Sequence, residues 1–510
     1  MNKIIYSSLL IAAPLVLSLT SCDLTRTPKS SLEASQSLST VADARNWERG
    51  MMASFRSMQA GIFQMEQDIQ GDQLQSTMKD GNNYSGASNW NTVTAGDYNR
   101  QDCYIAYYQS IANINRAFQD IEKIVPEGDE VAELDAIKGN MYFFRAYDYS
   151  SLAVRYGMRY NPATADSDLG VELKLTYEPT VLGTRSTNKE TYDQIYADLK
   201  QAETLLTGEK GAVGSDEITI DAVYSLEART RLYAQDWSGA LNAAKKVINS
   251  GTYKLVAPTA QSFKDMWVND SSSEEILMLF VSRPDETLTI NTYFGASTDA
   301  VRNENGVKGV NTPAFLPTQD LLDLYEEGDL RFPVFFEKQV VNVDDNLAEL
   351  YVVAKRKGNP AYAATQNAAF IWWNGYVPNG MHRPKVFRLA ELYLIAAEAS
   401  FRLNDESGAK KYLNDLRASR GLAAVSTSGN ALLKDIQDER TRELVFEGFH
   451  LWDLRRWGMN MDRDNAQPGT AGMMKPTAEH HFPNSDYRFV WPIPANDVTT
   501  NPNLIQNPGW

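Results

Sequence analysis

The chain has 510 residues, of which 43% are hydrophobic, and its formal net charge is -16 at pH 7. This length allows a large buried core, either as one multilayer body or as two closely packed domains. The acidic balance disfavours binding to nucleic acid and to anionic membranes. The aromatic content of 11% includes 25 Tyr and 10 Trp, which indicates that many rings lie at surfaces.

The N-terminus has the features of an export signal. Lys3 precedes an apolar run over residues 4–19, which polar residues and a proline interrupt. The run is too short and too broken to span a bilayer comfortably, so residues 1–21 are predicted to be a cleavable leader. No other segment of the sequence is apolar enough for a membrane span.

Residues Leu19, Thr20, Ser21 and Cys22 resemble a lipobox, in which the cysteine thiol receives a diacylglyceryl group before cleavage. Lipidated Cys22 would anchor the protein to a membrane, with the Ser- and Thr-rich stretch 22–40 as a tether. Cys103 then has no partner for an internal disulfide, and we expect it to be a buried, inert thiol.

The body, residues 41–510, is predicted to be a single mainly α-helical unit. Apolar residues three and four apart recur in eight segments. These segments are 102–125, 133–156, 189–206, 221–234, 237–249, 387–403, 407–420 and 432–446.

Two helix pairs repeat one another with an offset of 169 residues. The matching positions are Ala228, Leu232, Asp236, Ala240, Ala244 and Val247, and then Ala397, Phe401, Asp405, Ala409, Leu413 and Leu416. Alanines twelve residues apart are typical of tetratricopeptide-like repeats, whose paired helices approach closely. The helical repeats are expected at about 102–252, where 138–156 and 191–206 could form an interrupted pair, and at 387–420.

The segment 253–386 differs in composition, since it is richer in Pro, Gly and Asn and contains short β-prone stretches. The β-prone stretches are 276–281, 350–354 and 370–373. We expect this variable region to form loops, small strands and the ligand-binding surface. A second irregular stretch spans 79–97.

Aromatic residues in these irregular stretches are the candidate ligand contacts. Sugars need flat apolar faces with polar groups around them, which exposed rings beside Asn or Gln provide. Trp90, between Asn89 and Asn91, is the leading candidate, although a loop Trp that fills the body is an equal alternative. The other candidates are Tyr84, Tyr293, Phe294, Trp372, Trp373 and Tyr376. In contrast, Trp237, Trp452 and Trp457 are expected to be structural.

The charged segment 439–456 could be mistaken for a glycosidase site, because Glu443 and Glu447 lie one helical turn apart. The nearby Arg440, Arg442, Arg455 and Arg456 would keep both carboxylates ionised, however, so we predict a paired-charge lattice that braces the fold. The sequence has no catalytic motif, and its four histidines lack metal-ligand spacing. We therefore expect neither catalytic residues nor a metal or cofactor.

The same C-terminal region, 432–510, carries a dense pattern that resembles the SusD/RagB family. The pattern consists of Glu439, Arg440, Arg442, Glu443, Leu444, Glu447, Gly448, His450, Asp453, Leu454, Arg455, Arg456 and Trp457. Three further features agree: the helix 388–399, the Pro-Ile-Pro segment 492–494, and the ending Asn-Pro-Asn-Leu-Ile-Gln-Asn-Pro-Gly-Trp at 501–510. His450 departs from the pattern, because many relatives have Arg there.

This resemblance implies a SusD-like body on tetratricopeptide-like helix pairs with a loop-rich, minor-β ligand-binding region. It also implies an outer-membrane, surface-exposed lipoprotein that delivers a nutrient to a SusC-like TonB-dependent β-barrel transporter. An oligosaccharide or glycan is the expected nutrient. A peptide or other nutrient, as in the RagB branch, and a helical repeat scaffold that binds another protein are the alternatives. The remaining alternative is an enzyme, such as a surface glycosidase.

Overall fold

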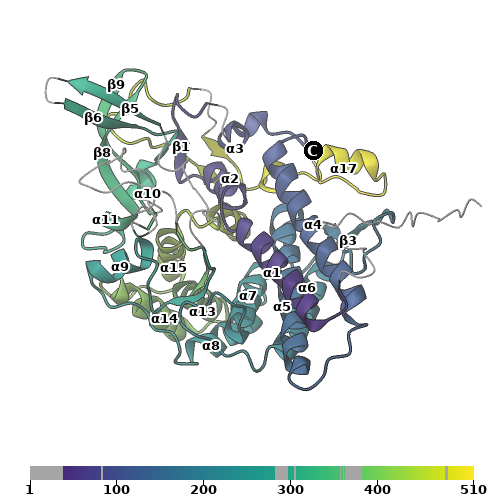
Figure 1. The fold of residues 1–510 in the computed structure, drawn as a ribbon. Coiled ribbons are helices and arrows are strands. Elements are labelled where there is room, and N and C mark those ends of the chain that lie inside the picture. Colours follow the sequence, from purple (N-terminus) through teal and green to yellow (C-terminus); the bar gives the residue numbers. More distant parts are fainter. Residues whose placement is uncertain are drawn as a thin grey trace, which may run out of the picture.

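Helices dominate the fold, which we describe from a computed structural model (Figure 1). The structure describes residues 38–81, 84–281, 297–303, 306–355, 358–359, 361, 382–476 and 480–510. The prediction of a mainly α-helical body is confirmed. Cys22 and the leader lie outside the described residues. Within the described part of the chain, none of the helices has the length and apolar character that a membrane span needs.

The first helix of the body, α1 (Val41–Ser57), begins at a capping box. The Thr40 hydroxyl accepts a hydrogen bond from the Asp43 backbone N–H at 3.1 Å, and the Asp43 carboxylate accepts one from the Thr40 N–H at 3.0 Å. Such caps satisfy N–H groups that the first turn leaves without partners. Helix α1 packs on the two longest helices, α4 (Tyr98–Ile121) and α5 (Glu130–Tyr156).

The repeated segments form two helical hairpins that pack together. The first consists of α7 (Ile220–Tyr233) and α8 (Trp237–Ile248), and the second of α13 (Leu389–Arg402) and α14 (Glu406–Ser419). Helix α13 packs on α8, so the two hairpins are in contact although the repeat places them 169 residues apart in the sequence. The shared alanines are fully buried, as small residues in a close helix contact must be: Ala228, Ala240, Ala397 and Ala409.

The repeat extends to the turns of the hairpins. Asp236 and Asp405 cap α8 and α14, each accepting a hydrogen bond from the backbone N–H three residues later, at 2.9 and 2.8 Å. The residues before them, Gln235 and Asn404, both adopt a left-handed backbone with φ of 58° and 64°. The internal repeat is therefore visible in backbone geometry, which is compatible with tetratricopeptide-like pairs.

The proposed third pair is also in contact, because α5 packs along α6 (Asn188–Leu205). The boundaries of the eight predicted helices agree with the structure to within a few residues. The other helices are α2 (Ile62–Gln70), α3 (Ser85–Ser88), α9 (Ala260–Trp267), α10 (Gln319–Asp323), α11 (Phe332–Phe335), α15 (Asn430–Glu443), α16 (His450–Trp457) and α17 (Ala495–Thr500).

The strands are short and form small sheets. A four-stranded sheet with the order β5-β6-β8-β9 lies at one corner of the body (Figure 1). Its strands are β5 (Ser297–Asn303), β6 (Gly306–Thr312), β8 (Phe336–Val343) and β9 (Asn346–Val353). The two-stranded sheets pair β1 (Leu74–Ser76) with β7 (Phe315–Pro317), β2 (Leu169–Glu172) with β3 (Arg185–Thr187), β4 (Glu275–Met278) with β10 (Lys385–Arg388), and β11 (Met461–Asp462) with β12 (His481–Phe482).

These strands confirm the minor-β character predicted for 253–386. The stretch 276–281 overlaps β4, and 350–354 overlaps the end of β9, whereas 370–373 lies outside the described residues. Strands β4 and β10 pair with each other near the two ends of this region. Beside this pair, the Leu279 N–H donates to the Pro384 carbonyl at 2.9 Å.

Candidate functional site

The carboxylates that could suggest catalysis are held in ion pairs. Glu443, at the end of α15, is 1% exposed. It accepts hydrogen bonds from Arg388 and Arg420, both at 2.8 Å, and from Arg331 at 3.0 Å. Burial alone would raise the pKa of Glu443, but these guanidinium groups outweigh it and hold that pKa well below its usual value.

Glu447 has the same kind of environment one turn further along. Its carboxylate accepts from the Lys355 ammonium at 2.7 Å and from Arg388 at 2.6 Å. Burial opposes ionisation, yet Arg388 and Lys355 lower the pKa of Glu447 to about 2. Acid catalysis needs a carboxyl group that is protonated near neutral pH. Since both carboxylates remain ionised, this pair has no general acid.

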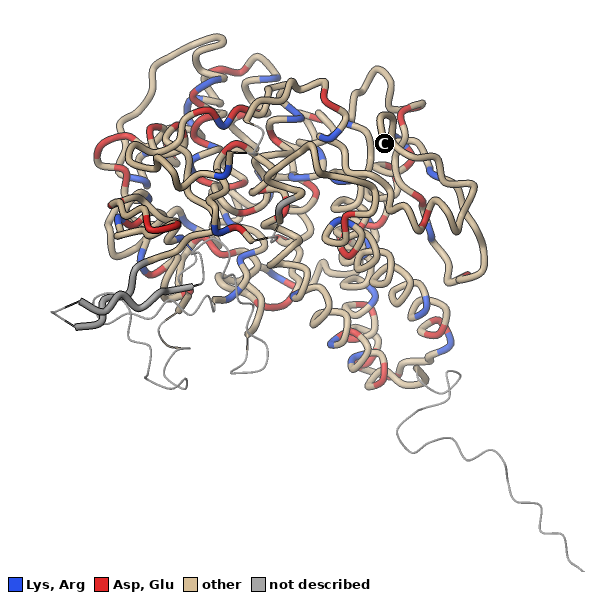
Figure 2. The backbone as a smooth tube through the Cα atoms, turned by 90° about the horizontal axis from the view of Figure 1, so that it is seen from above, with Lys and Arg blue, Asp and Glu red and all other residues tan. Residues whose placement is uncertain are grey.

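Both residues belong to a larger ionic lattice, so the predicted paired-charge arrangement is confirmed. The predicted partners are wrong, however, because Arg440 pairs with Asp453, Arg442 with Glu439, and Arg456 with Glu398 and Asp453. The lattice links β10, α14 and α15 to the segment between α10 and α11, to the segment before β4, and to Lys355 after β9. We define the ionic lattice as Arg331, Lys355, Arg388, Arg417, Arg420 and Arg442 together with Glu274, Glu326, Asp329, Glu439, Glu443 and Glu447. Figure 2 shows positive and negative residues close together along much of the chain. The lattice thus braces elements that are far apart in sequence.

The histidines have separate environments. His450 lies 2.5 Å from an Asp72 carboxylate oxygen; burial lowers the pKa of His450, but Asp72 outweighs it, so the net shift is upward. The pairing of β11 with β12 brings His481 opposite Asp462, and these two groups with Asp464 place ligand-type atoms within 4.8 Å of one another. All three are exposed, and exposed acidic groups commonly gather without an ion.

The leading aromatic candidate, Trp90, is a core residue, which corrects the expectation of an exposed ring. It is 0% exposed, its indole N–H donates to the Gln70 carbonyl at 2.8 Å, and it stacks on Phe482 with centroids 4.4 Å apart. The flanking Asn89 side chain accepts from the Asn91 N–H, so it caps a short 3-10 helix. The burial of Trp90 agrees with the alternative, in which a Trp in a loop packs into the core of the body.

Tyr84 is half-buried against a hydrophobic cluster that includes Ile69, Phe263 and Phe335, and burial raises its pKa to about 12. The five remaining candidates lie outside the described residues: Tyr293, Phe294, Trp372, Trp373 and Tyr376. The structural roles predicted for Trp452 and Trp457 agree with their environments. Trp452 is 2% exposed, and the Trp457 indole N–H donates to the Glu398 carboxylate at 3.2 Å.

Cys103 matches the predicted inert thiol. It is 0% exposed on α4, and burial raises the pKa of its thiol well above the usual value. Because thiolate formation is suppressed, this cysteine is not a nucleophile at neutral pH.

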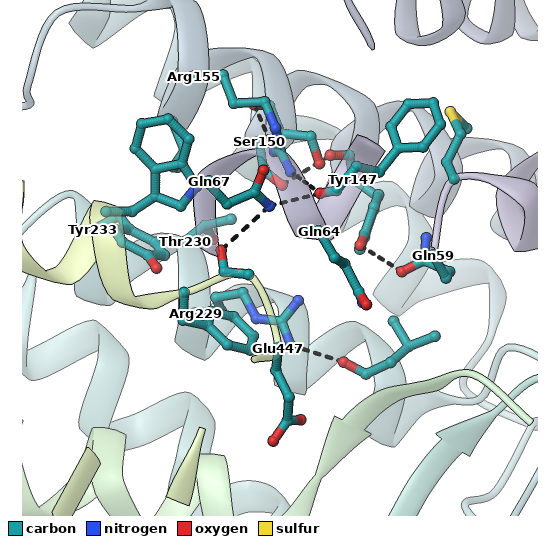
Figure 3. Close-up of a pocket in the computed structure, with 18 of the residues that line it drawn as sticks. Gln59, Gln64, Gln67, Tyr147, Ser150, Arg155, Arg229, Thr230, Tyr233 and Glu447 are labelled. Atoms are coloured by element: carbon teal, nitrogen blue, oxygen red, sulfur yellow. Dashed lines mark hydrogen bonds between the residues drawn. The ribbon is translucent and has the colours of Figure 1, made fainter. Parts of the chain in front are cut away.

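A pocket that sequence analysis did not predict lies at the centre of the body (Figure 3). It encloses a cavity of about 80 Å³ between α2, α5, α7, β10 and the segment that joins α15 to α16. The lining combines amides, aromatic rings and guanidinium groups, which suits binding through stacking and hydrogen bonds. It includes Gln59, Gln64, Gln67, Tyr107, Tyr147, Arg155, Arg229, Tyr233, Phe449 and Trp452.

Comparison with family models places this fold among known proteins. A model described as "SusD family", of the SusD/RagB type, matches residues 373–510, and a second, described as "Starch-binding associating with outer membrane", matches residues 33–232. The chain belongs to the SusD/RagB family. The resemblance found in the C-terminal pattern is thereby confirmed and extends to the N-terminal half.

Individual SusD/RagB relatives agree with this assignment. "SusD-like protein P38" of Formosa agariphila is 22% identical over 435 residues, which cover 79% of each chain. "Starch-binding protein SusD" of Bacteroides thetaiotaomicron is 32% identical over 129 residues, 24% of this chain and 21% of that protein. A crystal structure of a SusD superfamily protein from Bacteroides thetaiotaomicron has a TM-score of 0.75 at 24% identity, with 92% of this chain and all of that chain covered. SusD-like proteins are binding proteins, and neither family model indicates a catalytic family.

Proposed function

We propose that this chain is a lipid-anchored, cell-surface protein of the outer membrane that binds an oligosaccharide or glycan and delivers it to a SusC-like TonB-dependent transporter. The observation that carries the proposal is the ionisation of Glu443 and Glu447 inside the ionic lattice. Glu443 and Glu447 stabilise the fold through ion pairs and are not available as an acid and a base. A SusD/RagB chain of this kind is suited to bind a ligand without cleaving it.

The proposed ligand contacts are the rings on either side of the β4–β10 pair. Tyr293 and Phe294 follow β4, and Trp372, Trp373 and Tyr376 precede β10. Since Leu279 is hydrogen-bonded to Pro384, the two segments leave the described body at the same place.

A glycan panel tests this function. The purified protein is incubated with oligosaccharides and, for comparison, with peptides, while retention and product release are both measured. We expect retention of a glycan without product release. Retention of peptides alone would support the RagB-type alternative, and released product would indicate an enzyme.

Variants then locate the contacts. Replacing Trp372 and Trp373 together by alanine should weaken glycan retention, since each stacked ring typically contributes about 1 kcal/mol or more. Tyr98→Ala is the matched control, because Tyr98 is a 64% exposed ring at the start of α4. Equal affinity in all variants would remove these rings from the proposal.

A further inference from the structure

An open hollow that the proposed function does not use lies beside the four-stranded sheet, between the segment that runs from α10 to α11 and the strand β9 (Figure 1). Its volume is about 650 Å³, which falls within the range of small-molecule sites. Three aromatic rings and four carboxylates line it, and the lining contains neither Lys nor Arg among the described residues. We call this feature the aromatic hollow.

The rings of Tyr325, Phe332 and Tyr351 form one wall of the aromatic hollow. Phe332 contacts Tyr325 with ring centroids 5.7 Å apart and Tyr351 with centroids 5.1 Å apart, at interplanar angles of 65° and 76°. The Tyr325 hydroxyl donates to the Arg442 carbonyl at 2.8 Å, which fixes that ring. All three residues are half-buried and line the hollow, so a ligand can reach them.

Aromatic faces attract cations, because the π electrons make these faces negative. The buried Arg331 lies over Tyr325, with its Cζ 5.9 Å from the ring centroid. Within the described part of the chain, no Lys or Arg side chain lies over Phe332 or Tyr351. The rings of Phe332 and Tyr351 therefore remain available to a cation from outside the protein.

Two of the four carboxylates have no counter-ion. Glu326 and Asp329 belong to the ionic lattice, where arginines compensate them. Asp323 accepts a hydrogen bond from the neutral Gln319 amide at 2.7 Å, and neither Asp323 nor Glu327 has an ion pair among the described residues. Both side chains are exposed and line the hollow. Since the ionic lattice is balanced, these two charges give the hollow a negative potential.

A ligand that uses both the rings and the carboxylates carries its positive charge next to carbon. A hydrated metal ion would not use the rings, and an anionic sugar would be repelled by the carboxylates. We propose that the aromatic hollow binds a small organic cation, in which an ammonium group is carried on an apolar or sugar-ring body. An amino sugar and a choline-type head group share this chemistry. The site is additional to the proposed glycan contacts and goes beyond the proposed function.

Saturation-transfer NMR on the full protein, kept in a detergent without choline or sugar groups, tests the aromatic hollow. Choline and D-glucosamine are the cationic probes, used at about pH 6, where both carry a positive charge. Their neutral controls are neohexanol, in which carbon replaces the choline nitrogen, and D-glucose. Sodium chloride keeps the ionic strength constant. We expect at least one cation to bind at least about fivefold more tightly than its control, and the comparison of the two cations distinguishes the two sources.

Substitutions at Tyr351 test the aromatic face. Tyr351→Phe keeps the face and should bind the cation like the wild type. Tyr351→Leu keeps an apolar side chain without the face and should bind at least about threefold more weakly. Thermal unfolding shows whether each variant is folded. If Tyr351→Leu does not fold, the exposed carboxylates still decide the test.

A double variant tests the charges. Asp323→Asn with Glu327→Gln removes both unpaired carboxylates and should weaken cation binding by at least about threefold at low salt. Glu127→Gln with Asp129→Asn is the matched control. These two residues are also exposed and have no ion pair among the described residues, but they precede α5 and do not line the hollow.

Four results would overturn the proposal. The first is the absence of binding of either cation up to about 50 mM. The second is a neutral control that binds as tightly as its cation. The third is equal weakening by the control pair, which would assign binding to the overall negative charge of the protein. The fourth is equal cation binding by folded Tyr351→Phe and Tyr351→Leu. Glycan retention, measured in parallel, should be unchanged in all of these variants, so the two proposals fail independently.

Discussion

Replacing Glu443 by glutamine removes one negative charge from the ionic lattice and leaves the shape of the side chain almost unchanged. In the wild type, the six cations and six carboxylates of the lattice balance one another. Glu443 contacts three of the guanidinium groups, those of Arg331, Arg388 and Arg420. The variant therefore leaves one buried positive charge without compensation.

The expected loss follows from the desolvation of that charge. Breaking a buried ion pair by removing one partner costs about 3 to 5 kcal/mol, and the three contacts of Glu443 place it at the upper end. The assay is thermal and urea unfolding at pH 7, followed by circular dichroism. Glu349→Gln is the control, because Glu349 is 71% exposed and 3.7 Å from Lys338, so its change should stay within about 0.5 kcal/mol.

Two results would contradict the architectural role of Glu443. One is a stability of Glu443→Gln within about 0.5 kcal/mol of the wild type. The other is a folded variant that has lost the ability to cleave a polymer that the wild type cleaves. The second result would also return Glu443 and Glu447 to the role of a catalytic pair.

Three further predictions concern other parts of the fold. Burial raises the pKa of Glu275 to about 7, above its unfolded value, so its contribution to stability is present below pH 4.5 and is lost as the pH rises to 7. Glu275→Gln should therefore flatten the fall in stability between these pH values, as measured by urea unfolding at each pH. Asp405→Ala removes the cap of α14 and should cost about 0.5 to 2 kcal/mol in the same assay. Trp90→Ala should destabilise the protein by about 3 to 5 kcal/mol in thermal unfolding, with unchanged glycan affinity in the fraction that remains folded.

The helices were predictable because their signals are local. Apolar spacing gave the positions of α4 to α8 and of α13 to α15 within a few residues. The repeated aspartates, Asp236 and Asp405, were seen as matching positions of the repeat, and the structure shows that both cap helices. The charge of the segment 439–456 predicted an ionised Glu443, but all three of its partners, Arg331, Arg388 and Arg420, lie outside that segment.

Burial of Trp90 and the central pocket could not be predicted in this way. Trp90 sits between two asparagines in a polar stretch, and the ring that covers it, Phe482, comes almost 400 residues later. The pocket takes Gln67 from α2, Arg155 from α5 and Tyr233 from α7. No periodicity connects these positions, because only the packing of distant helices brings them together.

The balance of charge within the ionic lattice also shapes the field around the molecule. Because its six cations and six carboxylates cancel, the lattice adds little to the potential at long range, and the acidic excess of the chain resides elsewhere. An uncharged polymer approaches such a molecule without an electrostatic barrier. A polyanion such as a sulfated or uronate-rich chain meets repulsion that weakens as salt is added, since the Debye length shortens from about 30 Å at 0.01 M to about 10 Å at 0.1 M.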